Sequence, residues 1–419
     1  MWVATVKPTI LLVSTNSWLS PVRLAESLAD LGCAVQAVCT PRSALSISSA
    51  VGSTHHYRSF KPLLSIDAAI EAAHPDLIVP CDDLATAHLH ALYERKTCNG
   101  PLLPLATAAL LARSLGSPAS HPIVASRQKF LALAREEDVL VPDSALTPDL
   151  NALDEWLAGN GVPAVLKTDC TSGGQGVRIV NTRQQAQVAF RELASRRAMG
   201  RIVKDILADG AGSTFARVFR REQPLVSAHR FVAGQDANVA LACWQGEVLA
   251  QIAAVVLETR SPNGPAAVIR LVENSQMSDA VKKIVRRLGL SGFVGFDFVI
   301  EESTGRAFLI EINPRATQSC HLQLGSRSNL CAALCASLSG SAAAKKASVT
   351  RRETIVLWPH LAESLLPAHI VDNAYFDQPQ NDPEIVRLYG SNKGARLSNV
   401  MRSLWRAART RAALARRSS

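Results

Sequence analysis

The sequence predicts an α/β protein in three parts: an N-terminal α/β domain built on a parallel sheet, a larger α+β domain, and a small C-terminal extension. Two observations predict this organisation. Over residues 1–117, short apolar runs alternate with helical patterns. Residues 118–340 contain strand-like runs, two of which lead into clusters of glycines or of carboxylates. Residues 341–419 are first Ala/Ser-rich, then irregular, and end in a basic helical pattern.

The composition excludes several classes of protein. Hydrophobic residues make up 47% of the chain and charged residues 19%, as in folded globular proteins. The net charge is +10, but residues 391–419 contain eight basic side chains and no acid, so the rest of the chain carries only +2. A body so close to neutral argues against a nucleic-acid-binding protein.

Membrane and disulfide-rich classes are also disfavoured. No apolar run approaches the ~18–20 residues of a membrane span, and Thr9–Val13 is shorter than the core of a secretory signal. The nine cysteines contain no C-x-x-C pair, which argues against a zinc site or a disulfide framework. We expect most of them to be reduced residues of the apolar cores of a cytoplasmic protein.

The N-terminal domain is predicted from alternating strand and helix patterns, which favour a parallel sheet covered on both faces. Ser20 before Pro21 predicts the cap of the first helix, and Gly32 predicts its end. Asp82 or Asp83 is expected to cap a later helix. The expected strands are 9–14, 34–38 and 76–80, and a second helix is expected over 66–73.

The turn after the first strand, residues 14–21, contains no glycine. Dinucleotide-binding domains need a G-x-G-x-x-G pattern there, because glycine lets the backbone approach the pyrophosphate. We therefore interpret the N-terminal domain as a structural domain rather than a site for a dinucleotide cofactor.

Turn-forming residues over 115–122 mark the boundary to the second domain. Its patterns are mixed rather than strictly alternating, which predicts an α+β domain. The expected helices are 126–137, 183–198 and 278–288, and the expected strands are 164–167, 177–180, 239–244, 248–257, 292–300 and 307–312.

A lysine and a glycine-rich loop follow the first of these strands. Lys167 ends the strand, and the loop with Gly173, Gly174 and Gly176 leads into a second strand at Val177. Glycines let backbone N–H groups approach phosphate oxygens, and the lysine adds a positive charge. The P-loop pattern is absent. Taken alone, the segment is also compatible with a mobile hairpin turn.

The last two predicted strands, 292–300 and 307–312, form a hairpin if their turn centres on Thr304. Side chains alternate between the two faces of a strand, so this register puts Asp297 opposite Glu311. It also puts Phe296 and Phe298 opposite Ile312 and Ile310, on an apolar face.

The polar face of this hairpin predicts a metal site. Glu311 and Asn313 share that face with Asp297, and two carboxylates placed opposite each other repel unless a cation lies between them. Oxygen ligands suit Mg²⁺ that is shared with substrate phosphates. Arg315 follows Pro314 and is placed to reach a phosphoryl group. The alternative is a solvated sheet face that ends in an Asn-Pro turn.

The glycine-rich segment and the acidic hairpin together resemble the ATP-grasp fold over residues 120–340, and residues 1–117 resemble the α/β domain that usually precedes it. The resemblance implies that Asp297, Glu311 and Asn313 hold the metal. It also implies catalytic roles for Arg315 and Lys167. The implied nucleotide-binding residues are Arg127, Lys129, Lys167, Ser172, Gly173, Gly174, Gly176, Val177, Lys204, Asp205 and Leu207.

Two positions depart from the family's pattern. A basic residue at the start of the first helix corresponds to Arg127 or Lys129, and a lysine is commoner at the position that Arg127 occupies. The segment that contacts adenine usually reads Gln-Glu followed by apolar residues, whereas here it reads Val203-Lys-Asp-Ile-Leu207, with Asp205 in place of the usual acid.

The activity that the resemblance implies is an ATP- and Mg²⁺-dependent ligase, with Mn²⁺ as an alternative cation. A small-molecule carboxylate would attack the γ-phosphate of ATP and form an acyl phosphate, which an amine would then displace to make a carbon–nitrogen bond. The alternatives are a thiol acceptor in place of the amine and a protein that binds nucleotide without turnover.

The C-terminal residues form a basic amphipathic pattern, with Val400, Met401, Leu404 and Trp405 on one stripe. We favour a helix that packs on the protein's own body, and contact with an anionic membrane or a partner is the alternative. We expect no nucleic-acid partner. A homodimer is the default expectation for an enzyme of this kind.

Overall fold

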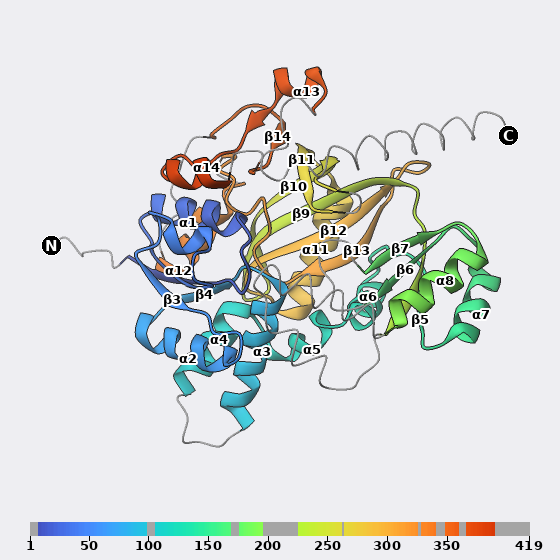
Figure 1. The fold of residues 1–419 in the computed structure, drawn as a ribbon, viewed down its shortest axis with the longest axis horizontal. Helices are drawn as coiled ribbons and strands as arrows, with labels where there is room; N and C mark the ends of the chain where they lie inside the picture. Colours follow the sequence, from blue (N-terminus) through green and yellow to red (C-terminus); the bar gives the residue numbers. More distant parts are fainter. Residues whose placement is uncertain are drawn as a thin grey trace.

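The computed structural model describes residues 7–98, 105–168, 176–195, 225–261, 264–325, 328–340, 348–359 and 366–389. Within them the chain forms three sheets, drawn in Figure 1: an N-terminal parallel sheet, a small antiparallel sheet and a large mixed sheet. This arrangement confirms the predicted parallel-sheet domain at the N-terminus and the mixed architecture that follows it. Among the described residues, no helix has both the length and the apolar character needed to span a membrane.

The N-terminal sheet has the strand order β3-β2-β1-β4, with every pair parallel. Its α1 face packs in a core shared with the large sheet, and its opposite face packs against α2, α3 and α4. The strand order changes direction between β1 and β4, so the turns after these two strands lie together at the carboxyl edge. The elements are β1 (Thr9–Val13), α1 (Ser20–Asp30), β2 (Ala34–Cys39), β3 (Ser53–His56), α2 (Pro62–Ala73), β4 (Leu77–Pro80), α3 (Asp83–Cys98) and α4 (Leu105–Leu115).

Helix ends in this domain test the predicted caps. The helix α1 begins at Ser20 and its cap position is Leu19, which makes no side-chain capping bond, so the predicted Ser20 cap is wrong by one residue. Gly32 follows the helix with a φ of +86°, a conformation that favours glycine, as predicted. Of the two candidate caps for α3, Asp82 is the one that accepts a hydrogen bond from Ala85 N, at 2.8 Å.

The small sheet has the order β5-β8-β6-β7, and all its neighbouring strands are antiparallel. Helices α7 and α8 pack on one face through a core that includes Leu166, Phe190 and Ala228. The strands β6 and β7 match their predicted ranges, whereas β5 and β8 were not predicted. The elements are β5 (Ser144–Thr147), α7 (Leu150–Asn160), β6 (Ala164–Thr168), β7 (Val177–Val180), α8 (Arg183–Ala194) and β8 (Val226–Arg230).

The large sheet has the order β13-β12-β9-β10-β11-β14-β15. Its pairs are antiparallel except for β14 and β15. One face packs against α6 and α11, around the fully buried Phe130 and Phe296. The strands are β9 (Gly234–Trp244), β10 (Glu247–Thr259), β11 (Ala266–Leu271), β12 (Gly292–Glu301), β13 (Ala307–Asn313), β14 (Thr354–Val356) and β15 (Tyr375–Phe376), and the helices are α6 (Arg127–Glu136) and α11 (Ser275–Leu288).

The opposite face of the large sheet meets the N-terminal domain. Helix α12 (Leu330–Ser339) packs on β9 and β10, and its apolar residues join a continuous core that includes Leu12 of β1 and Leu28 of α1. The C-terminal segment adds β14, α13 (Ala368–Asn373), β15 and α14 (Pro383–Tyr389). Residues assigned to the C-terminal extension therefore complete the large sheet, and Ile385 of α14 packs against Val22 of α1.

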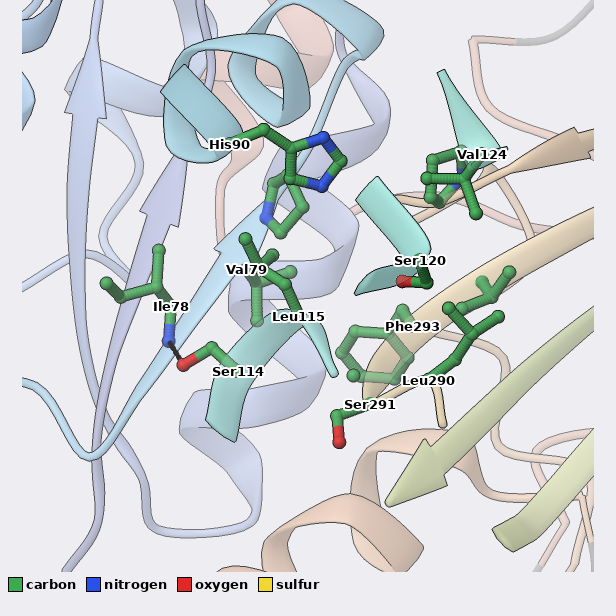
Figure 2. A pocket seen from close by; sticks show the side chains of 14 residues that line it. Ile78, Val79, His90, Ser114, Leu115, Ser120, Val124, Leu290, Ser291 and Phe293 are labelled. Atoms are coloured by element: carbon green, nitrogen blue, oxygen red, sulfur yellow. Dashed lines mark hydrogen bonds between the residues drawn. The ribbon is translucent and has the colours of Figure 1, made fainter. Parts of the chain in front are cut away.

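A linker of short helices, η2 (Pro118–Ser120) and α5 (His121–Val124), runs between the N-terminal domain and the large sheet. Figure 2 shows the narrow pocket at this boundary, lined by Ile78 and Ser114 on one side and by Ser291 and Phe293 on the other. Backbone bonds also cross the boundary: Ser117 N donates to Gly289 O at 2.9 Å, and Ala316 N donates to Pro80 O at 3.0 Å. The second domain is thus held firmly against the first.

Candidate active site

The acidic hairpin forms as predicted in the part that carries the polar residues. Asp297 lies opposite Glu311, and Phe296 lies opposite Ile312. Between Asp297 and Phe298 the register shifts by one residue, so Phe298 lies opposite Leu309 and the predicted pairing of Phe298 with Ile310 is wrong. Such a bulge inserts one extra residue in one strand and bends it. The apolar face survives, because Phe296, Phe298 and Leu309 are all buried in the core against α6 and α11.

Asp297 and Glu311 are two carboxylates that face each other across the hairpin. Asp297 accepts a hydrogen bond from Asn313 Nδ2 at 2.8 Å, and Asn238 of β9 lies directly across the sheet from it. Burial and the neighbouring Glu311 carboxylate raise the pKa of Asp297 to about 6. A cation between the two carboxylates would relieve both effects.

The donor set at this point fits Mg²⁺. In the described part of the chain, no group of three or more His, Cys, Asp or Glu side chains is placed to hold a metal ion. Asp297 and Glu311 offer two carboxylates, and Asn313 turns its amide nitrogen to Asp297 and its oxygen to Arg315. Mg²⁺ is typically held by one or two carboxylates together with substrate phosphates. The hairpin therefore suits a cation that arrives with a phosphorylated ligand better than a resident structural metal.

Arg127 supplies a positive charge to the acidic hairpin. Its guanidinium forms an ion pair with Glu311 at 2.7 Å, and the Arg127 side chain is only 10% exposed. Arg127 is the first residue of α6, whose start is fixed by Ser126: the Ser126 hydroxyl accepts a hydrogen bond from Lys129 N. Lys129 itself is exposed. Of the two predicted basic residues, the structure brings Arg127 to the acidic hairpin.

Lys167 reaches the same region from the small sheet. It lies near the end of β6 and is 8% exposed. Burial and the nearby Arg127 charge lower the pKa of Lys167, while Glu311, Asp297 and Asp236 oppose that shift. The charges that shift the pKa of Lys167 therefore belong to α6, β9, β12 and β13. A side chain of the small sheet thus interacts electrostatically with charged residues of the large sheet and of α6.

The sheet face that carries Lys167 mixes apolar side chains with the polar Ser227 and His229, and among the described helices α7 and α8 cover the opposite face. Strand pairing puts Val165, Val177 and Ile179 on this face with Lys167, and α7 and α8 pack on the other face. Ile179 is 46% exposed, and Leu146 of β5, on the same face, is 42% exposed. Exposed apolar side chains on the same face as a buried lysine are suited to a ligand with a flat apolar part and an anionic part.

Two polar side chains of β8, Ser227 and His229, lie on the same sheet face as Lys167. His229 Nε2 is 2.9 Å from Ser227 Oγ, and the Ser227 hydroxyl donates to the Lys167 carbonyl at 3.3 Å. Burial lowers the pKa of His229 well below its usual range, and the charges of Lys167 and Arg127 lower it further. His229 therefore stays neutral and acts as a hydrogen-bonding support.

Arg315 connects the hairpin to the N-terminal domain. Its Nε donates to Asp83 Oδ1 at 2.6 Å, its second terminal nitrogen donates to Asn313 Oδ1 at 3.0 Å, and its guanidinium lies 5.3 Å from the centre of the Trp18 ring. Trp18 follows β1 and Asp83 follows β4, the two strands that flank the change in strand order. Open α/β sheets characteristically bind ligands at that edge.

The remaining predicted residues divide into two groups. Gly176 is buried and its carbonyl accepts a hydrogen bond from Thr168 N at 3.0 Å, which closes the base of the glycine-rich loop. Val177 begins β7 opposite Lys167. The predictions for Ser172, Gly173, Gly174, Lys204, Asp205, Leu207 and the basic C-terminal helix lie outside the described residues.

Sequence reasoning missed several polar groups near the hairpin. Asp236 and Asn238 lie on β9 on the same face as Asp297, and their two-residue spacing at the start of a strand was the available signal. Asp83 was considered only as a helix cap, because its contact with Arg315 spans 232 residues. The crossing from β8 to β9 at Phe231–Ala233, which joins the small sheet to the large one, was also missed.

Comparisons with known proteins agree with this architecture. Residues 194–319 match the family model of the ATP-grasp domain. Among solved structures, biotin carboxylase from Campylobacter jejuni in complex with β-γ-ATP is similar with a TM-score of 0.60 at 14% identity, over 81% of this chain and 72% of that one. N5-carboxyaminoimidazole synthetase from Staphylococcus aureus with ADP has a TM-score of 0.54 at 14% identity, over 81% and 80% of the two chains.

A third solved structure is the biotin carboxylase domain of 2-oxoglutarate carboxylase from Hydrogenobacter thermophilus, in complex with MgADP, ADP and bicarbonate. It has a TM-score of 0.56 at 14% identity, over 81% of this chain and 71% of that one. At such identities the likeness shows the fold, and the family model of the ATP-grasp domain matches the central part of that fold, residues 194–319. This chain therefore has the ATP-grasp fold, preceded by a parallel-sheet α/β domain.

Proposed function

We propose that this protein is an ATP-dependent ligase that activates a small carboxylate as an acyl phosphate and joins it to an amine. The observation that carries the proposal is the meeting of charges from three separate parts of the chain. Lys167 from the small sheet, Arg127 from α6 and Arg315 beside the N-terminal domain surround the carboxylates of Asp297 and Glu311. Phosphoryl transfer needs positioning and neutralisation of charge more than covalent help, and this cluster offers both.

The nucleotide is proposed to lie between the small and the large sheet. The apolar side chains Val165, Ile179 and Leu146 would contact the base, and the crossing at Phe231–Ala233 would offer backbone donors and acceptors to its edge. Lys167 lies on the same sheet face, so it would face the phosphates of a nucleotide bound there. The predicted glycine-rich loop follows β6 and would cover those phosphates from above.

Asp297, Glu311 and Asn313 would hold Mg²⁺, which when bound supplies positive charge to the phosphate oxygens. Arg127 pairs with Glu311 in this structure. When the nucleotide binds, Glu311 would leave the Arg127 guanidinium and contact Mg²⁺ instead. The released Arg127 guanidinium would then be free to donate to phosphate oxygens, in the forked geometry that suits them.

Arg315 is proposed to orient the substrate carboxylate and the transferring group. Asp83 and Asn313 hold its side chain at the edge of the N-terminal sheet, beside the turns where ligands bind in α/β sheets. The acceptor amine would approach from the same edge. One similar structure contains bicarbonate and MgADP, so bicarbonate belongs among the carboxylates to be tested here.

The test is ADP release from MgATP with pooled small carboxylates, including bicarbonate, and pooled amino acids and other amines. The diagnostic variant is Glu311→Gln, which keeps the shape of the side chain and removes its charge. The matched control is Glu302→Gln, an exposed glutamate at the tip of the same hairpin. We expect ADP release that depends on added substrates, is unchanged in Glu302→Gln, and falls by about 10²–10³-fold in Glu311→Gln.

Three outcomes would contradict the proposal in different ways. Normal turnover in Glu311→Gln would remove the carboxylates from the reaction. Tight ATP binding without any release of ADP would favour a nucleotide-binding protein without turnover. Release that requires a thiol rather than an amine would keep the carboxylate activation but replace the acceptor.

A further inference from the structure

Cys33 and Cys335 bring two thiols together across the boundary between the N-terminal domain and the large sheet. Their sulfur atoms are 3.0 Å apart, although the residues are separated by 302 positions in sequence. Cys33 follows the end of α1, just before β2, and Cys335 lies on α12. The seven cysteines whose side chains are described are free thiols. Among them, Cys33 and Cys335 are the pair whose sulfur atoms are in direct contact.

We propose that Cys33 and Cys335 form a reversible disulfide bond that fastens the N-terminal parallel sheet to helix α12. This goes beyond the ligase activity and does not depend on it. It also departs from the expectation, drawn from composition, that the cysteines serve only as reduced packing residues.

The surroundings favour closure of the bond without rearrangement. Helix α12 and the N-terminal sheet already share one core, in which Leu28 of α1 and Leu334 of α12 are fully or almost fully buried. A disulfide needs a narrow range of separations and is strained when the backbone must move. Here both thiols belong to segments that are held against each other by apolar packing, and closing the bond requires the two sulfur atoms to approach by about 1 Å.

The two thiols differ in exposure and in pKa, and these differences indicate which one attacks the oxidant. Cys335 is half-buried and Cys33 is 7% exposed, so the pair borders the surface on the side of α12. The hydrogen bond between the two sulfur atoms lowers the pKa of Cys33 and outweighs the effect of burial. A thiolate is the nucleophile in disulfide exchange, so Cys33 is the better attacking group.

The exchange needs an oxidant, and a low-molecular-weight disulfide such as oxidised glutathione supplies it. The Cys33 thiolate attacks one sulfur of the oxidant, whose S–S bond breaks and releases one glutathione thiolate. The Cys335 thiol gives its proton to the solvent and attacks the Cys33 sulfur of the mixed disulfide, expelling the second thiolate. Two protein thiols and one small disulfide thus become one protein disulfide and two small thiols, with two electrons passed to the oxidant.

A competing pairing makes the test sharp. Cys331 lies one turn before Cys335 on the same helix. Its thiol donates to the Cys320 carbonyl at 3.5 Å, whereas the Cys335 thiol contacts Cys33. Cys331→Ser is therefore the matched control for Cys335→Ser: both change one thiol of α12, and only the second removes a proposed partner. Cys243 is fully buried, so its reaction with an alkylating reagent reports unfolding.

The experiment incubates the full chain with oxidised glutathione, blocks free thiols with N-ethylmaleimide, and maps linked peptides by mass spectrometry without reduction. We expect a Cys33–Cys335 peptide in the wild type and in Cys331→Ser, its absence in Cys335→Ser, and its loss on treatment with dithiothreitol. Closing a loop of this length in a chain of this size is expected to raise the thermal midpoint by about 5 °C, in the two proteins that form the bond.

Several results would overturn the proposal. One is recovery of both Cys33 and Cys335 as alkylated peptides while Cys243 stays protected. Others are stable glutathione adducts on either residue without linkage, or linkage of Cys33 to Cys331. A linked peptide that appears only when Cys243 also reacts would mean that the bond forms in unfolded chains, which would equally refute it.

Discussion

A stacked pair of buried histidines should make this protein sensitive to mild acid. His90 of α3 and His121 of α5 stack with ring centres 3.8 Å apart, and both are at most 9% exposed. Burial lowers the pKa of His90 to about 3, helped by His121, and lowers the pKa of His121 to about 4. His121 Nε2 is buried without a hydrogen-bond partner, which leaves a charged ring nothing to donate to. Figure 2 shows His90 beside the boundary pocket.

The size of the effect follows from proton linkage. In the unfolded chain a histidine has a pKa of about 6.5, so it takes up a proton as the pH falls below that value, whereas the folded protein keeps both rings neutral down to about pH 4. The unfolded state therefore binds more protons, and stability falls as the pH falls. Between pH 7.5 and pH 5.0 each histidine lowers the free energy of unfolding by about 2 kcal/mol, or about 4 kcal/mol for the pair.

Urea unfolding at pH 7.5 and at pH 5.0 measures this loss. The double variant His90→Phe/His121→Phe keeps two stacked rings and removes both titrations, so its loss between the two pH values should be smaller than that of the wild type by about 4 kcal/mol. His369→Gln, which changes an exposed histidine of α13, is the control and should lose as much as the wild type. Comparing pH dependence, rather than stability at one pH, cancels any packing cost of the larger rings.

Equal losses in the wild type and the double variant would refute the reasoning, because they would mean that the two rings are already protonated or hydrated in the folded protein. An equally reduced loss in His369→Gln would assign the acid sensitivity to exposed histidines instead. The expected result would link acid to the boundary between the N-terminal domain and the large sheet, on which the position of Arg315 depends.

Three further predictions concern single contacts. Asp377→Asn removes a buried carboxylate from the Arg23 guanidinium and should lower the free energy of unfolding by about 3–5 kcal/mol in urea; a change below about 1 kcal/mol would contradict the importance of this ion pair. Asp83→Asn removes the carboxylate that pairs with the Arg315 guanidinium. It should reduce kcat/KM for the proposed ligation by about 10²-fold and leave the thermal midpoint unchanged. Unaltered kinetics would argue against a positioning role for Asp83. Phe296→Ala empties the core beneath the acidic hairpin and should cost about 3–5 kcal/mol by urea unfolding, and a smaller cost would show that the core collapses around the gap.

The acidic hairpin was predictable because its information is local. Alternation of side chains along a strand shows which residues share a face, and it placed Asp297, Glu311 and Asn313 together. The register was harder to predict: next to the turn, Ile300 pairs with Ala307, so the turn centres between Ser303 and Thr304 rather than on Thr304. The bulge after Asp297 adds one residue and brings Asp297 opposite Glu311, and a bulge depends on how the strand bends over the core beneath it. Pattern alone cannot show a bend that tertiary packing imposes.

Contacts between distant segments were out of reach for a related reason. The short strands β5 and β8 pair across about 80 residues, and four or five residues carry too little periodicity to identify a strand. Arg315 was predicted to reach a phosphoryl group, but Asp83, which holds it, comes from another domain. An aspartate at the start of a helix is usually interpreted as a helix cap. The sequence therefore offered no reason to pair Asp83 with Arg315.

The position of Arg315 explains why the two domains are packed so closely. Its guanidinium is fixed at one end by Asn313 of the acidic hairpin and at the other by Asp83 of α3, so a shift of either domain would move a charge at the proposed reaction site. Backbone bonds from Ser117 to Gly289 and from Ala316 to Pro80 hold the same boundary on either side of this contact. The small sheet contributes Lys167 through β6 and joins the large sheet through the crossing at Phe231–Ala233. The contacts at Arg315 would keep the carboxylate site fixed. The small sheet, which carries Lys167, could then adjust its position as the nucleotide binds without disturbing that site.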